Sequence, residues 1–83
     1  MNKELIIETL RIAVRMEGGL VFSDGAEYPI EKGFNIHGMK PESGVVLDFG
    51  YSDIAKFPMK STDEIDSTAD LIAEAIKKFY STF

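Results

Sequence analysis

The single histidine of the chain, His37, is the side chain best suited to acid–base chemistry near neutral pH. Asp48 follows on the next predicted strand, and a histidine held by an aspartate is part of the Ser-His-Asp arrangement of hydrolytic enzymes. No serine, however, lies in a G-x-S-x-G elbow, where such a nucleophile would be positioned. The sequence therefore predicts no catalytic residue. A small-ligand site or enzyme that uses His37, Asp48 and Tyr51 is the less favoured alternative.

The residue types also predict no metal site and no cofactor. Cysteine is absent and histidine occurs once, so the nitrogen and sulfur ligands of common metal sites are few. The acidic residues Asp63, Glu64 and Asp66 are typical of a helix N-terminus, where the helix dipole favours negative charge. No glycine-rich phosphate loop is present.

Composition and charge limit the class of partner. A chain of 83 residues corresponds to a single domain, residues 1–83. Its net charge of −5 argues against direct binding of nucleic acid or an anionic membrane through a basic patch. No run of 18 apolar residues could span a membrane, and Glu4, Glu8 and Arg11 interrupt any signal-peptide core. We therefore expect a cytoplasmic protein.

The clearest structural pattern lies at the carboxyl end of the chain. Apolar residues recur there at alternating spacings of four and three, which places them on one face of an α-helix: Ile65, Ala69, Ile72, Ile76, Phe79 and Phe83. Ser61 and Glu64 form the S-x-x-E pattern of a capping box. Lys77 and Lys78 lie where the helix dipole favours positive charge. The sequence predicts a helix over residues 62–82.

Residues 34–39 and 44–51 are predicted to form a β-hairpin across the turn-rich residues 40–43. The length of this loop fixes which residues face each other, and the apolar ones then share one face. The pairs on that face are Phe34 with Phe49, Ile36 with Leu47 and Gly38 with Val45. On the opposite face Asn35 lies across from Asp48, and His37 across from Val46.

The amino-terminal residues allow two interpretations. Residues 2–17 fit a helix that begins at Asn2 and ends at Gly18 and Gly19. Residues 9–17 also alternate between apolar and polar as a strand does, in which case the two glycines form a hairpin turn. The helix is favoured, because residues of high helix propensity dominate the segment.

The remaining segments complete the predicted fold class. Residues 20–23 and 26–30 are short strands, the second limited by Pro29. Residues 52–60, which contain Pro58, are an edge strand or an irregular link. We therefore expect a two-layer α+β domain in which a small, mostly antiparallel sheet of 3–4 strands packs against an N-terminal and a C-terminal helix, in the order α-β-β-β-α.

Two surfaces are candidates for interaction with a partner. One is the sheet face expected to be left bare, whose mixture of residue types suits a moderately polar interface: Asn35, His37, Met39, Val46 and Asp48. The other comprises Phe79, Tyr80 and Phe83. These aromatic residues either close the core of the domain or extend beyond it and dock on a second copy or on another protein.

The expected function is that of a small acidic protein-interaction or regulatory domain without catalytic activity, whose partner is another protein or a second copy of itself. An alternative is an acidic mimic of nucleic acid that inhibits a DNA- or RNA-binding enzyme. That alternative requires folding to gather the carboxylates along one stripe.

Overall fold

The computed structural model describes residues 3–16, 20–22, 27–31, 33–38, 44–50 and 52–82 of the chain. The elements in chain order are the helix α1 (Lys3–Ala13), the strands β1 (Val14–Met16), β2 (Leu20–Phe22), β3 (Glu27–Glu31), β4 (Phe34–Gly38), β5 (Val45–Phe49) and β6 (Ser52–Phe57), the 3₁₀ turn η1 (Thr62–Glu64) and the helix α2 (Ile65–Tyr80). The predicted α+β class is confirmed, with a helix at each end and the strands between them.

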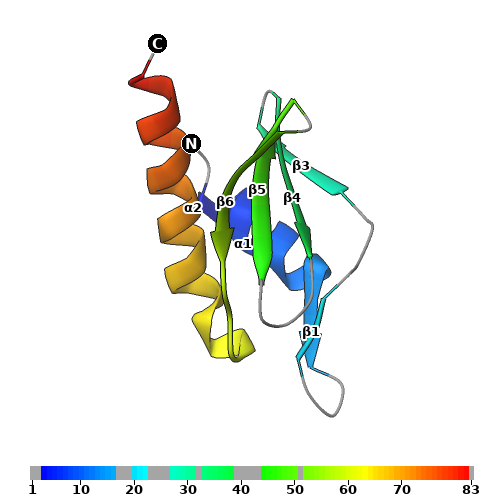
Figure 1. The fold of residues 1–83 in the computed structure, drawn as a ribbon. Coiled ribbons are helices and arrows are strands. Elements are labelled where there is room, and N and C mark those ends of the chain that lie inside the picture. The colour runs from blue at the N-terminus through cyan, green and yellow to red at the C-terminus, as the bar shows by residue number, and fades with distance from the viewer. Residues whose placement is uncertain are drawn as a thin grey trace.

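Four of the strands form the main sheet. It is antiparallel, in the order β3-β4-β5-β6, while β1 and β2 form a separate two-stranded ribbon. Both helices lie on one face of the main sheet, and the β1–β2 ribbon lies beyond its lower end (Figure 1). Helix α1 contacts β3, β4 and α2, and α2 also contacts β6. The two-layer arrangement is therefore as predicted.

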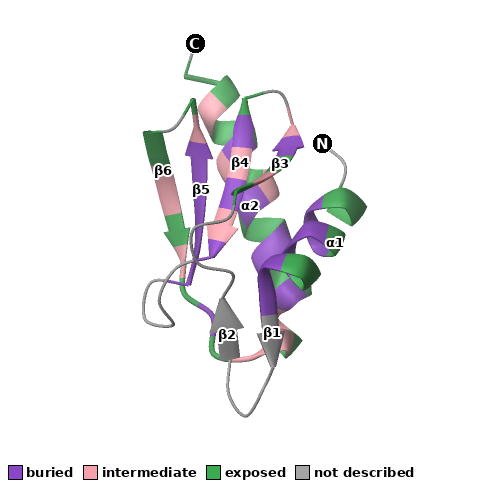
Figure 2. Ribbon diagram, turned by 90° about the vertical axis from the view of Figure 1, so that its right-hand side faces the viewer, coloured by how far each residue is buried: buried purple, intermediate pink, exposed green. Residues whose placement is uncertain are grey.

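The β4–β5 pairing has the predicted register. Phe34 faces Phe49, Ile36 faces Leu47 and Gly38 faces Val45. The apolar members of these pairs point towards the helices, and Phe34, Ile36, Val45 and Leu47 are fully buried there. Figure 2 shows this burial along the centre of the sheet. A register shift of one residue would turn these side chains to the other face, so the apolar pattern and the pairing depend on each other.

The amino-terminal helix is shorter than predicted. Helix α1 ends at Ala13, and the chain continues directly into β1, which pairs with β2. The extension of the helix to residue 17 is thus wrong over residues 14–16, where the strand interpretation holds. Pairing with β2 supplies backbone hydrogen bonds to a segment that starts with the β-branched Val14, and this tertiary contact outweighs helix propensity. The predicted helix end or turn at Gly18 and Gly19 lies outside the described residues.

The carboxyl-terminal helix begins with a tighter turn than predicted. Ser61 caps it as expected, but its Oγ accepts a hydrogen bond from the backbone N–H of Asp63 at 3.1 Å instead of that of Glu64. The Glu64 carboxylate accepts from the N–H of Lys60 at 3.4 Å. The first turn is therefore the 3₁₀ turn η1, and α-helical geometry starts at Ile65. The predicted apolar face is confirmed at Ile65, Ala69, Ile72 and Ile76, all buried; Phe83 lies outside the described residues.

Strand β6 resolves the ambiguity of residues 52–60. It is an edge strand that contains a bulge opposite Leu47 and Asp48, and Pro58 follows its last residue. Because a bulge adds one residue to one strand, it changes which side chains face the helices. Ile54, which the register leaves without a partner at the bulge, packs against the core, and so does Phe57 after the bulge, while Lys56 stays exposed. Without the bulge, Lys56 would face the core in place of Phe57.

No helix among the described ranges is long and apolar enough to cross a membrane.

We expect Ile72→Ala to lower the free energy of unfolding by about 2–5 kcal/mol, because it removes a buried aliphatic side chain and leaves a cavity. Ile72 has no exposed surface, whereas the neighbouring Leu71 is 57% exposed. Leu71→Ala is therefore the matched control, and we expect it to change stability by no more than about 0.5 kcal/mol. Urea unfolding followed by circular dichroism measures both. Equal losses in the two variants would contradict the orientation of α2.

Candidate functional site

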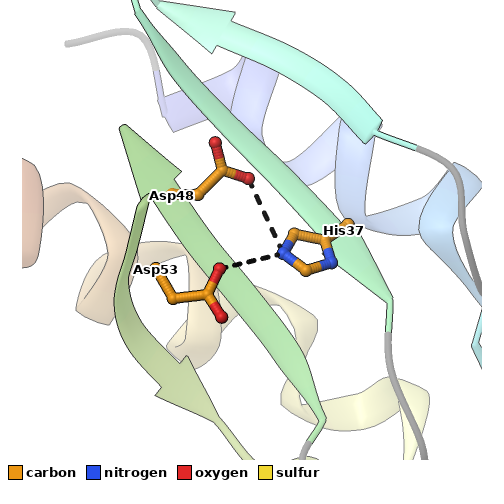
Figure 3. A group of neighbouring side chains, drawn as sticks. All are labelled: His37, Asp48 and Asp53. Carbon is orange, nitrogen blue, oxygen red and sulfur yellow. Dashed lines mark ion pairs between the residues drawn. The ribbon is translucent and has the colours of Figure 1, made fainter. Parts of the chain in front are cut away.

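Three side chains that can donate to a cation or exchange protons meet on the sheet face opposite the helices. His37 comes from β4, Asp48 from β5 and Asp53 from β6, which are consecutive strands of the sheet. His37 Nε2 lies 3.6 Å from Asp48 Oδ2 and 3.5 Å from Asp53 Oδ1 (Figure 3). The imidazole nitrogen thus points towards both carboxylates.

Asp48 is the least usual member of this group, because its side chain is only 1% exposed. Its Oδ1 accepts a hydrogen bond from Asn35 Nδ2 at 3.3 Å, across the β4–β5 pairing. Its Oδ2 has no hydrogen-bond donor among the described residues. A buried carboxylate oxygen without a donor is costly, and a donor or a positive charge near Oδ2 would offset that cost.

The arrangement can meet this need in two chemical ways. A protonated His37 would form ion pairs with both aspartates, although 3.5 and 3.6 Å exceed the usual length of an N–H···O hydrogen bond. Alternatively, a cation can be held between the three residues, whose ligand atoms all lie within 4.8 Å of one another. The structure thus brings His37 close to Asp48, as the less favoured alternative drawn from the sequence requires.

The expectation that this face of the sheet is bare is wrong for Val46 and Asp48, which are both buried. Asn35 and His37 are half-buried, and Met39 lies outside the described residues. Val46 is flanked on the same face by His37 and Lys56 of the neighbouring strands. Long side chains on adjacent strands can cover a short side chain between them. The alternation of residues along a single strand does not reveal this burial.

Sequence reasoning missed Asp53. The sequence pattern predicted no pairing partner for residues 52–60. It therefore gave no reason to expect an acidic residue of this segment beside His37 and Asp48. The available signal was the short connection at Gly50 and Tyr51. A tight turn there makes 52–57 the continuation of the hairpin and sets Asp53 opposite Asp48, as the structure has it. Tyr51 itself lies outside the described residues.

The carboxyl-terminal aromatic residues divide between two environments. The ring of Phe79 packs against the core. Its centre lies 5.3 Å from the ring centre of Phe34 and 4.8 Å from that of Phe49. Phe79 thus helps to close the core of the domain. Tyr80 also contacts Phe34, at 5.5 Å between ring centres, but it is 50% exposed. Phe83 lies outside the described residues.

Tyr80 borders a groove between α2 and the end of β3. The groove has a volume of about 290 Å³, and six residues line it: Glu31, Ala73, Glu74, Ile76, Lys77 and Tyr80. The Tyr80 hydroxyl donates a long hydrogen bond of 3.4 Å to Glu31 Oε2, which ties the end of α2 to β3. The sequence did not indicate this groove, because Glu31 and Tyr80 come together only through the fold.

Comparison of the chain with protein-family models, with curated proteins and with solved structures gives no significant match.

We expect Glu31→Gln to lower the pKa of Tyr80. Partial burial of the phenol and the adjacent negative charge of Glu31 both raise the pKa of Tyr80 above its usual value, since each disfavours the phenolate. Removing the charge takes away the second effect, so Tyr80 should ionise at lower pH. A pH titration of the Tyr80 ring resonances by NMR measures the change. Glu27→Gln, on an exposed position of the same strand, is the control and should leave the titration unchanged.

Proposed function

We propose that the protein is a small cytoplasmic protein-interaction or regulatory domain without catalytic activity of its own. We further propose that it binds a basic segment of another protein in the groove between α2 and β3. The observation that supports this proposal is the groove itself, which combines an apolar floor with a charged rim at the end of the C-terminal helix.

The size and lining of the groove suit a protein side chain. At about 290 Å³ it lies at the lower limit of pockets that hold drug-sized ligands, so one or two side chains of a partner fit it better. Ala73, Ile76 and the Tyr80 ring offer apolar contacts. Tyrosine is also among the residues that most often contribute strongly to protein interfaces, because one side chain supplies both a ring and a hydroxyl.

The charges around the groove favour a basic partner. Glu31 and Glu74 lie on its rim together with Lys77, and the whole chain carries a net charge of −5. An apolar side chain flanked by lysine or arginine would bury its apolar part on the floor and pair its charge with the rim. A second copy of this chain carries the same negative charge, so repulsion disfavours it as the partner.

One observation favours the acidic-mimic alternative as a second candidate. Asp66, Asp70 and Glu74 lie four residues apart on α2, with Asp63 just before them, and all four are exposed. Residues at this spacing lie above one another along one side of a helix. Lys3 pairs with Asp70 at 2.9 Å, which reduces the negative charge of the stripe. We therefore rank this candidate second.

A photo-cross-linking amino acid placed at single positions of α2 and β6 tests the proposal and separates the two candidates. Position 80 reports on the groove and position 66 on the acidic stripe. The exposed position 56 of β6 is paired with Val46, on the sheet face opposite the helices, and serves as the control. We expect position 80 alone to cross-link one cellular protein through a basic peptide. We also expect Glu31→Lys to reduce the yield, because it reverses a charge on the rim.

Three results would contradict this proposal. Cross-linking of a nucleic-acid-binding enzyme from position 66 would support the second candidate instead. Cross-linking of the chain to itself from position 80 would identify a second copy as the partner. Equal cross-linking from positions 80 and 56 would show that the groove is not a specific binding site.

A further inference from the structure

We propose that His37, Asp48 and Asp53 form a binding site for one divalent transition-metal cation of the zinc class. This inference is independent of the groove, because the three residues lie on the sheet face opposite the helices (Figure 3).

The buried carboxylate of Asp48 is the first support. Its side chain is 1% exposed, its Oδ2 is directed towards His37 Nε2, and no donor among the described residues bonds that oxygen. The cost of burying a carboxylate is usually offset by hydrogen bonds, by a charged partner or by a metal ion. Here one oxygen is bonded to Asn35, and the other is turned into the cluster.

The spacing of the ligand atoms is the second support. Tetrahedral coordination with bonds of about 2.0–2.1 Å places ligand atoms about 3.3 Å from one another. The two distances from His37 Nε2, 3.5 and 3.6 Å, are close to this value and longer than direct hydrogen bonds. The whole set falls within 4.8 Å, so a small movement of one side chain brings all three to bonding distance.

The structure also shows which side chain can make that movement. Asp48 is buried and the His37 side chain is 19% exposed, whereas the Asp53 side chain is 54% exposed. Asp53 stands on the edge strand β6, where its rotamers are less restricted by neighbours. Two ligands are thus held by packing, and the third closes from the solvent side and leaves one position for water.

Asn35 has a positioning role in this site. Its Nδ2 donates to Asp48 Oδ1, which holds the carboxylate with Oδ2 towards His37. Partners that orient metal ligands in this way typically change metal affinity by about 10–100-fold when they are removed.

The donor set favours transition metals over magnesium or calcium. Mg²⁺ and Ca²⁺ prefer sites made only of oxygen, whereas an imidazole nitrogen with two carboxylates suits Zn²⁺ and its neighbours. We therefore use Zn²⁺ as the probe and Mg²⁺ as the comparison.

The test is a titration of the chelator-treated protein with Zn²⁺, monitored by NMR and by isothermal calorimetry. Because His37 is the single histidine, its ring nitrogen resonances report on this site without overlap. We expect one Zn²⁺ per chain and a saturable shift of the Nε2 resonance. The unfolding midpoint should rise by about 11–22 °C when Zn²⁺ exceeds the dissociation constant about 100-fold.

Four variants distinguish this site from adventitious binding to surface carboxylates. His37→Gln and Asp53→Asn change residues that are not fully buried, so both should fold, and each should weaken Zn²⁺ binding at least about tenfold. Asn35→Ala should weaken it by about 10–100-fold. Asp66→Asn, on the exposed side of α2, is the control and should bind as the unaltered chain does.

Three outcomes would overturn the proposal. The first is the absence of a saturable shift at His37 up to millimolar Zn²⁺, which would leave a protonated imidazole as the partner of Asp48. The second is unchanged Zn²⁺ affinity in His37→Gln. The third is Mg²⁺ binding as tight as Zn²⁺ binding, since the imidazole would then contribute nothing.

Discussion

The pairing of β4 with β5 in a single register is the constraint on which the rest of this structure depends. It turns Phe34, Ile36, Leu47 and Phe49 towards the helices, and the same alternation turns Asn35, His37 and Asp48 the opposite way. The apolar face gives α1 and α2 a surface to pack on. The polar face gathers the group around His37. A shift of one residue would exchange the two sets and destroy both.

The two faces differ in how their burial is stabilised. On the helix side, stability comes from apolar area removed from water and from the ring contacts between Phe34, Phe49 and Phe79. On the other side, the buried Asp48 depends on polar neighbours, namely Asn35 and His37. A buried polar group of this kind is weak evidence that the group stabilises the fold. It is better evidence that the group has a specific role.

The parts of the fold that follow from local pattern were predictable from the sequence. The periodicity of α2 and the register of the β4–β5 hairpin are encoded in the spacing of residues close along the chain. Val14 was misassigned because its pairing with Phe22, and not its own propensity, decides its conformation. The bulge in β6 was not predicted, because it interrupts the alternation of apolar and polar residues on which strand prediction relies.

The candidate sites were less predictable, since each joins elements that only the fold brings together. The proximity of His37 and Asp48 could be predicted because both lie in one hairpin. The position of Asp53 beside them depends on the pairing of a third strand. The burial of Val46 and Asp48 depends on side chains of neighbouring strands, which no single-strand pattern contains. The groove beside Tyr80 likewise joins Glu31 of β3 to the last turns of α2.

The register of β4 and β5 is tested most directly by cross-strand nuclear Overhauser contacts in a solution NMR spectrum of the full chain. The account predicts backbone contacts between Asn35 and Asp48 and between His37 and Val46. Contacts of His37 with Val45 or Leu47 as its directly opposite partner would contradict it, because the two faces of the sheet would then be exchanged.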